Sequence, residues 1–309
     1  MSVFIGFDTS NYTTSAAAVR DGEIVSSVRI MLSVAEGERG LRQSDALFSH
    51  TKNLPEVTAR LGSHNPSAVG CAHAPRDVPG SYMPCFLAGV AAASTLANLL
   101  GVPLYKFSHQ AGHIMAALFG CGKTELWCGG GEFLSFHVSG GTTELLHVKN
   151  RMITRLGGTL DISAGMAIDR IGVRLGLKFP CGPELERLAE SGRLPREPVR
   201  VSVRGCDLNL SGLENKAAAL LERGEEPASV ALYTLEFIAR TLVAVTENAT
   251  QRYPGIPLIC AGGVMSNKLI AAAIKNKFDA YFAPPELSCD NAVGIALLTE
   301  MEYTDGKCI

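Results

Sequence analysis

The sequence lacks any Cys-x-x-Cys pair, and its nine cysteines are an odd number. A disulfide framework normally needs an even, patterned set, and a thiolate zinc site normally needs closely spaced pairs. The scattered thiols therefore indicate reduced cysteines. The N-terminal residues also lack the charged and apolar regions of a signal peptide and enter a predicted strand directly. We expect a cytoplasmic protein.

An excess of charge of one sign is also missing, since the net charge is −2. Without a global basic field, contact with nucleic acid would need a local patch or a partner protein. Val78–Tyr105 has no charged residue, but prolines, glycines and polar residues interrupt it. A membrane span needs roughly 20 mostly apolar residues in one run. We expect no membrane contact, and a helix at Cys85–Leu100 that is either core or half of a protein–protein interface.

What the sequence does contain is an internal repeat. Phe4–Val19 aligns with Phe133–Val148 at a constant separation of 129 positions, without a gap and with six identities in sixteen. Each copy predicts a strand, a tight turn and a second strand. Strands alternating with helices follow each copy, and a chain of 309 residues exceeds the usual size of one core. We predict two α/β lobes, residues 1–120 and 121–309, joined by a glycine-rich link at 120–131.

The turn of the second copy is Ser139-Gly140-Gly141-Thr142. Adjacent glycines let backbone N–H groups approach an anion, and hydroxyls add donors, so this turn suits a phosphate. An ordinary glycine-containing hairpin is the alternative, and the turn alone favours it. The repeat changes this balance, because paired hairpins of this kind hold phosphates in nucleotide-binding folds of the actin, hexokinase and Hsp70 type.

Two histidines, His109 and His113, lie four residues apart on a predicted helix, so both imidazoles share one face and could bind one metal ion. Gln110 stands where a zinc protease of the His-Glu-x-x-His type has its general base, which argues against a metalloprotease. A polar helix face explains the pair equally well. A third ligand would decide, and Asp290 and His137 are candidates, although an aspartate before a helix is more often an N-cap.

Three polar residues could bind a nucleoside. Asn267 follows a glycine-rich strand-to-helix turn, where its amide offers a donor and an acceptor to a base. Asp169 and Glu186 could hold ribose hydroxyls beside a glycine-lined wall at Gly182. A capped turn and ordinary salt bridges are the alternatives.

The loop Ala74–Pro84 is rich in proline and glycine and carries Arg76 and Asp77. Loops of this kind are usually solvated connectors. Its position after a predicted buried strand nevertheless makes it a candidate site.

Together these motifs resemble the threonylcarbamoyl-adenosine synthase family, TsaD in bacteria, formerly labelled O-sialoglycoprotein endopeptidases. The matching segments run in chain order: FDTSNYTTS, HQAGH, VSGGTTEL, GGTLDISAGMAIDRIGVRLGL, FPCGPELERLA, CAGGVMSN and ELSCDN. The family's fold is a duplicated actin-like α/β fold, which agrees with the repeat. In the family's reaction a threonylcarbamoyl group leaves its AMP mixed anhydride for the adenine beside the tRNA anticodon.

The resemblance implies ligands and their sites. One divalent metal ion (iron, zinc or magnesium) would bind His109, His113 and Asp290, with His137 as a fourth ligand where archaeal and eukaryotic members carry Tyr. Catalysis would lie at Asp8 and Ser10, the phosphates and acyl group at Ser139, Gly140, Gly141 and Thr142, and the nucleoside at Asp169, Gly182, Glu186 and Asn267. The expected nucleotide is ATP or an AMP-derived acyl adenylate. Expected partners are tRNA, through a partner complex, and a paralogous actin-like subunit or a second copy of this chain.

The first turn departs from the family. It reads Asp8-Thr9-Ser10-Asn11-Tyr12-Thr13-Thr14, where the family usually carries Glu-Thr-Ser-Cys-Asp-Glu-Thr. Tyr12 and Thr13 thus replace an acidic pair, and Ala111 replaces an acid between the two histidines. The motifs favour a tRNA threonylcarbamoyl transferase. The departures favour a divergent nucleotide- and metal-binding paralogue with a regulatory or scaffold role, or one with a different acceptor, and a metalloprotease is the weakest interpretation.

Overall fold

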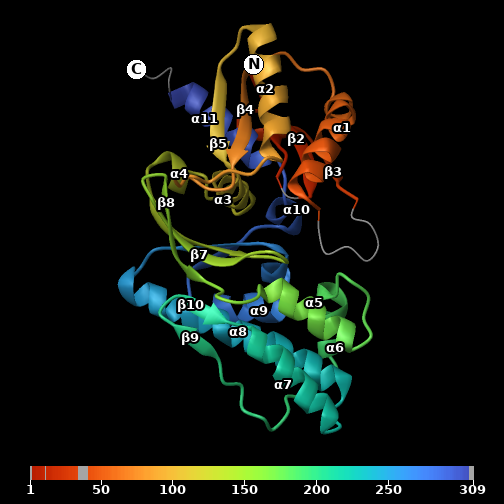
Figure 1. Cartoon of the computed structure of the whole chain (residues 1–309). Coiled ribbons are helices and arrows are strands. Elements are labelled where there is room, and N and C mark those ends of the chain that lie inside the picture. The colour runs from red at the N-terminus through yellow and green to blue at the C-terminus, as the bar shows by residue number, and fades with distance from the viewer. Residues whose placement is uncertain (1, 11, 34–40, 306–309) are drawn as a thin grey trace. The chain divides into compact units, whose positions relative to one another are not determined.

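The computed structural model describes residues 2–10, 12–33 and 41–305, which form two compact units (Figure 1). The first unit contains Met1–Thr124 and Glu286–Ile309, and the second contains Glu125–Pro285. The sequence-based boundary at 120 lies close to the observed break. The predicted second lobe ran to residue 309, however, whereas the last segment belongs to the first unit.

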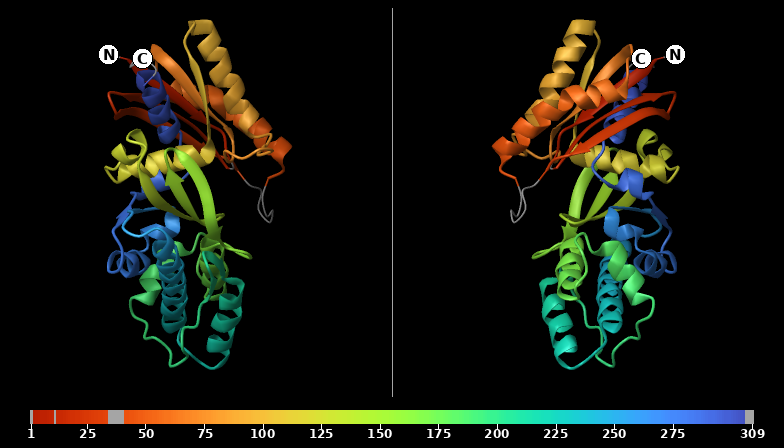
Figure 2. Two further views of the ribbon diagram at one scale, coloured as in Figure 1. Left: turned by 90° about the vertical axis from the view of Figure 1, so that its left-hand side faces the viewer. Right: turned by 90° about the vertical axis from the view of Figure 1, so that its right-hand side faces the viewer.

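A five-stranded mixed sheet forms the first unit, in the order β3-β2-β1-β4-β5. Its strands are β1 (Val3–Asp8), β2 (Thr13–Arg20), β3 (Glu23–Met31), β4 (Pro66–Ala74) and β5 (Leu104–Ser108). Its main helices are α1 (Gln43–Leu61), α2 (Phe86–Leu100), α3 (His109–Gly120) and α11 (Val293–Asp305). Helices α1 and α2 cover one face of the sheet, and α11 covers the other (Figures 1 and 2).

The C-terminal helix α11 joins the first unit because strand β1 has room for it. Phe7 of β1 packs in the core beneath α1 and α2. Gly6, its neighbour, faces the opposite side, where a Cβ would come within 2.5 Å of the Ala296 nitrogen of α11. The absent side chain therefore lets the helix lie directly on the strand, and nothing in the local sequence of the second half predicts this return.

The second unit repeats the same sheet, in the order β12-β11-β6-β7-β8. Its strands are β6 (Glu132–Val138), β7 (Thr143–Lys149), β8 (Met152–Gly158), β11 (Leu258–Ala261) and β12 (Ala280–Phe282), with a separate hairpin of β9 (Ser202–Arg204) and β10 (Asp207–Asn209). Its helices include α5 (Ala164–Arg174), α6 (Gly182–Ala189), α7 (Ser211–Glu222), α8 (Pro227–Arg252) and α9 (Lys268–Lys275).

The predicted duplication is confirmed in strand register. Phe4 pairs with Val19 between β1 and β2, and Phe133 pairs with Val148 between β6 and β7, at the same separation of 129 positions. The next strand in space is parallel in both units: β4 beside β1, and β11 beside β6. The same hairpin, with a parallel strand beside its first strand, therefore occurs in both sheets.

Two expected segments differ from the sequence-based description. The predicted glycine-rich link contains a short helix, α4 (Glu125–Cys128), which buries Trp127. The apolar helix α2 is only partly core, because Leu99 is 81% exposed. Helix α8 is long and apolar enough to cross a membrane by length and composition, but 72% of its most apolar window is buried, as expected for a core helix.

Candidate functional site

Helix α3 carries the two histidines on one face. The Ser108 side chain caps the helix by accepting a hydrogen bond from the Ala111 N–H at 3.1 Å, and serine is one of the residues preferred at this position. His109 and His113 are one helical turn apart, and their ring centroids lie 4.3 Å from each other. The first turn of α3 therefore sets the positions of both imidazoles.

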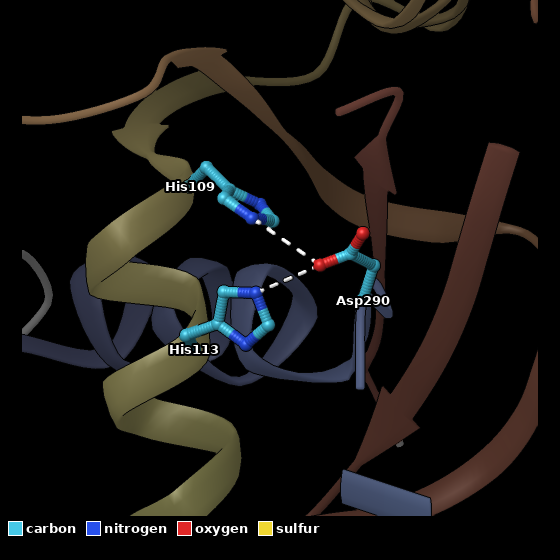
Figure 3. Close-up of side chains that lie close together, drawn as sticks. All are labelled: His109, His113 and Asp290. Atoms are coloured by element: carbon cyan, nitrogen blue, oxygen red, sulfur yellow. Dashed lines mark hydrogen bonds and ion pairs between the residues drawn. The ribbon is translucent and has the colours of Figure 1, made fainter. Parts of the chain in front are cut away.

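The third member, Asp290, arrives on the segment before α11. A Cβ on Gly294 would come within 1.9 Å of the Gly112 carbonyl oxygen, so α3 and α11 touch backbone to backbone. This contact places Asp290 beside the histidines (Figure 3). The N-cap interpretation does not describe Asp290, since the neighbouring Asn291 side chain accepts the Val293 N–H at 2.9 Å.

The three side chains converge on one point. Asp290 Oδ1 lies 3.0 Å from His113 Nε2 and 3.5 Å from His109 Nε2. Neighbouring ligands of a tetrahedral ion with bonds of about 2.1 Å are separated by about 3.4 Å, so these spacings fit one metal ion. Two imidazoles with one carboxylate suit iron or zinc better than magnesium, which prefers oxygen ligands.

Asp8, predicted to be catalytic, contacts His109 instead of standing apart from the histidines. Its Oδ2 atom lies 2.7 Å from His109 Nδ1, and its Oδ1 atom accepts the Ser10 N–H at 2.9 Å. The carboxylate is buried at the end of β1. A carboxylate on one ring nitrogen fixes the orientation of the imidazole and leaves the other nitrogen for a metal. No sequence signal links these two residues, which are 101 positions apart.

The charges in the cluster shift the pKa values of its members. Burial alone would lower the pKa of His109, but the Asp8 and Asp290 carboxylates outweigh it and raise that pKa from 6.5 to about 10. Burial would likewise raise the pKa of Asp290, but hydrogen bonds from His109 and His113 hold it well below its usual range. In the protein without a metal ion, His109 therefore carries a proton near neutral pH.

Ser10, the other predicted catalytic residue, lies in the turn after β1. Its hydroxyl is buried and has no hydrogen-bond partner among the described residues. Asn11, part of the altered turn, lies outside the described residues. Tyr12 accepts the Leu32 N–H through its carbonyl at 2.7 Å and is 40% exposed.

The predicted phosphate turn lies in the second unit, between β6 and β7. The Ser139 N–H donates to the Thr142 carbonyl at 2.7 Å, and the Thr142 N–H donates to the Ser139 hydroxyl at 3.1 Å. A Cβ on Gly140 or Gly141 would meet no atom within 4 Å. Both glycines are exposed, and the Gly140 carbonyl accepts a hydrogen bond from the Ser163 hydroxyl.

The four predicted nucleoside residues also belong to the second unit, where hydrogen bonds connect each of the two acids to a chain neighbour of one of the other two residues. Asp169 Oδ1 accepts the Cys181 N–H at 2.8 Å, next to Gly182 at the start of α6. Glu186 Oε1 accepts the Lys268 N–H at 2.8 Å, next to Asn267. Burial raises the pKa of Asp169.

His137 lies on β6 in the second unit, opposite Glu144 of β7 and Ala261 of β11. His109, His113 and Asp290 all belong to the first unit. The role of His137 as a fourth metal ligand stays a prediction.

Known proteins resemble this chain in sequence and in fold. The family model TsaD, tRNA N6-adenosine threonylcarbamoyltransferase, matches residues 74–297. A Methanopyrus kandleri protein with that same name is 32% identical over 307 residues, covering 94% of this chain and 84% of its own. A Thermus thermophilus protein of that name is 34% identical over 313 residues, covering 98% and 93%.

Solved structures share the fold at lower identity. HypF of T. kodakarensis superimposes with a TM-score of 0.66 at 14% identity, over 98% of this chain and 48% of its own. The activator of a Clostridium difficile 2-hydroxyisocaproyl-CoA dehydratase gives 0.55 at 12% identity, over 99% and 97%. These likenesses confirm the duplicated actin-like α/β fold. The family-model match and the two relatives in sequence show that the chain belongs to the TsaD family of transferases, the tRNA N6-adenosine threonylcarbamoyltransferases.

Proposed function

We propose that this chain transfers a threonylcarbamoyl group from threonylcarbamoyl-AMP to adenosine in tRNA, with the help of one divalent metal ion. One observation carries the proposal: His113 and Asp290, 177 positions apart in a chain of this family, meet with His109 at a single point. An ordinary salt bridge needs only one imidazole and one carboxylate. Here two imidazoles face the same carboxylate oxygen, as ligands of one metal ion would.

Iron or zinc is the ion that this donor set favours. When bound, it would polarise the acyl donor and neutralise its phosphate. His109 and His113 would each offer Nε2, and Asp290 would offer Oδ1. Asp8 would hold His109 Nδ1 and so keep its Nε2 directed at the ion. His137 is proposed as the fourth ligand.

The nucleotide is proposed to bind in the second unit. Backbone N–H groups at Gly140 and Gly141, with the Ser139 and Thr142 hydroxyls, would hold its phosphates. The same residues are suited to ATP or to the acyl adenylate.

The nucleoside would use the polar atoms that the protein's own hydrogen bonds leave over. Asp169 and Glu186 each use one carboxylate oxygen on a backbone N–H, so the second oxygen of each would accept a ribose hydroxyl. Asn267 Oδ1 caps α9 by accepting the Ile270 N–H at 3.1 Å. The Asn267 amide nitrogen would therefore be the group that donates to the base.

A second function, the divergent paralogue that binds nucleotide and metal without modifying tRNA, is favoured by the first turn. Asp8 is shorter than the family's usual Glu, and both of its oxygens are engaged, by His109 and by Ser10. It is therefore committed to the cluster and is not available to orient an attacking amine.

The proposed partners are tRNA and a second actin-like chain in the cytoplasm. The net charge of −2 supports tRNA binding through a complex rather than by this chain alone. An apolar groove of 410 Å³ between α1 and α2, lined by Leu54, Ala88 and Leu96 among others, supports pairing with a paralogous subunit or a second copy.

The test is a transfer assay. The protein is incubated with unmodified tRNA, threonylcarbamoyl-AMP and the partner proteins, and the digested nucleosides are weighed by mass spectrometry. The wild-type chain is expected to give threonylcarbamoyl-adenosine, and His113→Ala to give none. No product from the wild-type chain with all partners present would favour the divergent paralogue.

A further inference from the structure

The loop Ala74–Pro84, between β4 and α2, reaches the first turn of α3. Asp77 Oδ2 accepts a hydrogen bond from the Ser108 hydroxyl at 2.7 Å. The Gln110 N–H donates to the Pro75 carbonyl at 3.1 Å. The loop therefore forms hydrogen bonds with the N-terminus of α3, the helix that begins at His109.

We propose that Asp77 is a positioning residue for the metal site and acts through Ser108. The inference rests on the proposed metal binding by His109, His113 and Asp290. Asp77 forms no described hydrogen bond with any of these three residues. Asp77 fixes the cap of α3, and the cap fixes where the His109 ring stands.

The chemistry of the cap gives Asp77 this role. Ser108 is fully buried, and its oxygen accepts the Ala111 N–H at 3.1 Å. A hydroxyl can present its lone pair to that N–H only if its own hydrogen points elsewhere. Asp77 receives that hydrogen, and the short bond to an ionised carboxylate is of the stronger kind. The hydroxyl is thus held in the rotamer that caps the helix.

The negative charge adds to the same effect. Asp77 lies at the N-terminus of α3, where the helix dipole favours an anion. His109 is the first residue of that helix and is held on its other side by Asp8. If the first turn of α3 became looser, the hydrogen bond between His109 and Asp8 would be strained. The His109 ring would then shift relative to His113, which lies one helical turn further along α3.

The loop contains hydrogen bonds that do not involve the Asp77 side chain, so we expect it to keep its conformation without that side chain. The Arg76 N–H donates to the Ser81 hydroxyl at 3.0 Å, and the Ser81 N–H donates to the Val78 carbonyl at 3.1 Å. The side chain of Asp77 is exposed apart from its contact with Ser108. Its loss is expected to change metal binding much more than thermal stability.

The experiment measures Co²⁺ affinity and the visible spectrum of bound Co²⁺ in the full chain. Asp77→Ala is expected to weaken binding about 10-fold, the lower end of the effect of residues that support metal ligands. Asp77→Ser, whose side chain is too short to reach the Ser108 hydroxyl, should weaken it as much. Asp77→Asn keeps an acceptor oxygen and should restore most of the affinity. Val78→Ala, in the same loop, is the matched control and should bind as the wild type does.

A double-mutant cycle separates positioning from a general loss of charge. The Ser108→Ala variant should bind Co²⁺ no more tightly than Asp77→Ala, and adding Asp77→Ala to it should weaken binding no further, because both act through one hydrogen bond. Wild-type affinity and spectrum in Asp77→Ala would overturn the proposal, as would an Asp77→Asn variant as weak as Asp77→Ala. A wild-type chain that binds no Co²⁺ would instead overturn the metal site itself.

Discussion

Lowering the pH from 8 to 7 is expected to weaken metal binding about tenfold. His109 must lose its proton before Nε2 can bind an ion. The flanking carboxylates of Asp8 and Asp290 raise its pKa from 6.5 to about 10, so it is protonated across this range. Metal and proton therefore compete for the same ring, and affinity rises with pH.

The size of the effect follows from one proton. Below a pKa of about 10, each unit by which the pH falls adds about 1.4 kcal/mol to the free energy of removing the His109 proton, which raises the dissociation constant of the metal ion about tenfold. Binding of one ion at pH 7.5 should release at least one proton per chain.

Calorimetry gives both quantities. Titrating Zn²⁺ into metal-free protein at pH 7 and pH 8 yields the two affinities. Repeating the titration in two buffers with different protonation enthalpies yields the number of protons released.

Asp8→Asn removes one of the two charges that raise the pKa of His109, so it should shift the pH dependence to lower pH. It should also weaken binding about 10-fold to 100-fold, because the ring loses its orienting carboxylate. Asp45→Asn, an exposed acid on α1, is the control and should change neither. Equal affinities at both pH values, with no proton release, would refute the protonated state of His109.

Three further substitutions, one of them with a control, test close packing at two glycines and the charge of one aspartate. Gly294→Ala places a Cβ against the Gly112 carbonyl and should lower the free energy of unfolding by about 1–3 kcal/mol, measured in urea, together with metal content. Gly165→Ala would bring a Cβ within 2.5 Å of the Gly140 Cα, so it should weaken ATP binding by calorimetry, whereas Gly212→Ala, which meets no atom within 4 Å, should not. Burial opposes ionisation of Asp161, but backbone hydrogen bonds from Leu210 and Ser211 outweigh it and lower its pKa from 3.8 to about 2. Its stabilising effect is therefore fully present above pH 3.8 and lost as the pH falls through 2, so Asp161→Asn should remove about 1 kcal/mol at pH 6 and much less at pH 2, after allowance for its exposure to solvent.

The sequence predicts the repeat well because a hairpin is local. Phe4–Val19 and Phe133–Val148 each contain both strands and the turn, so the alternation of side chains sets the register within sixteen residues. The N-cap at Ser108 is equally local. The spacing of His109 and His113 likewise fixes their shared face.

Contacts between distant segments could not be predicted in the same way. The hydrogen bond between Asp8 and His109 and the return of α11 to the first unit both depend on tertiary packing. Gly6 and Gly294 permit that packing. A glycine in a strand or helix, however, does not indicate from the sequence which segment of the chain will pack against it. The contact of Asp77 with Ser108 belongs to the same class.

The most direct test of the account is the transfer rate as a function of metal occupancy. Zn²⁺ or Fe²⁺ is added in steps to metal-free protein with tRNA, threonylcarbamoyl-AMP and partner proteins, and the modified nucleoside is quantified at each step. The transfer rate is expected to rise in proportion to bound metal and to level off at one ion per chain, with no rise for His113→Ala. Full transfer by the metal-free protein, or an undiminished rise in His113→Ala, would contradict the claim that this cluster supports the reaction.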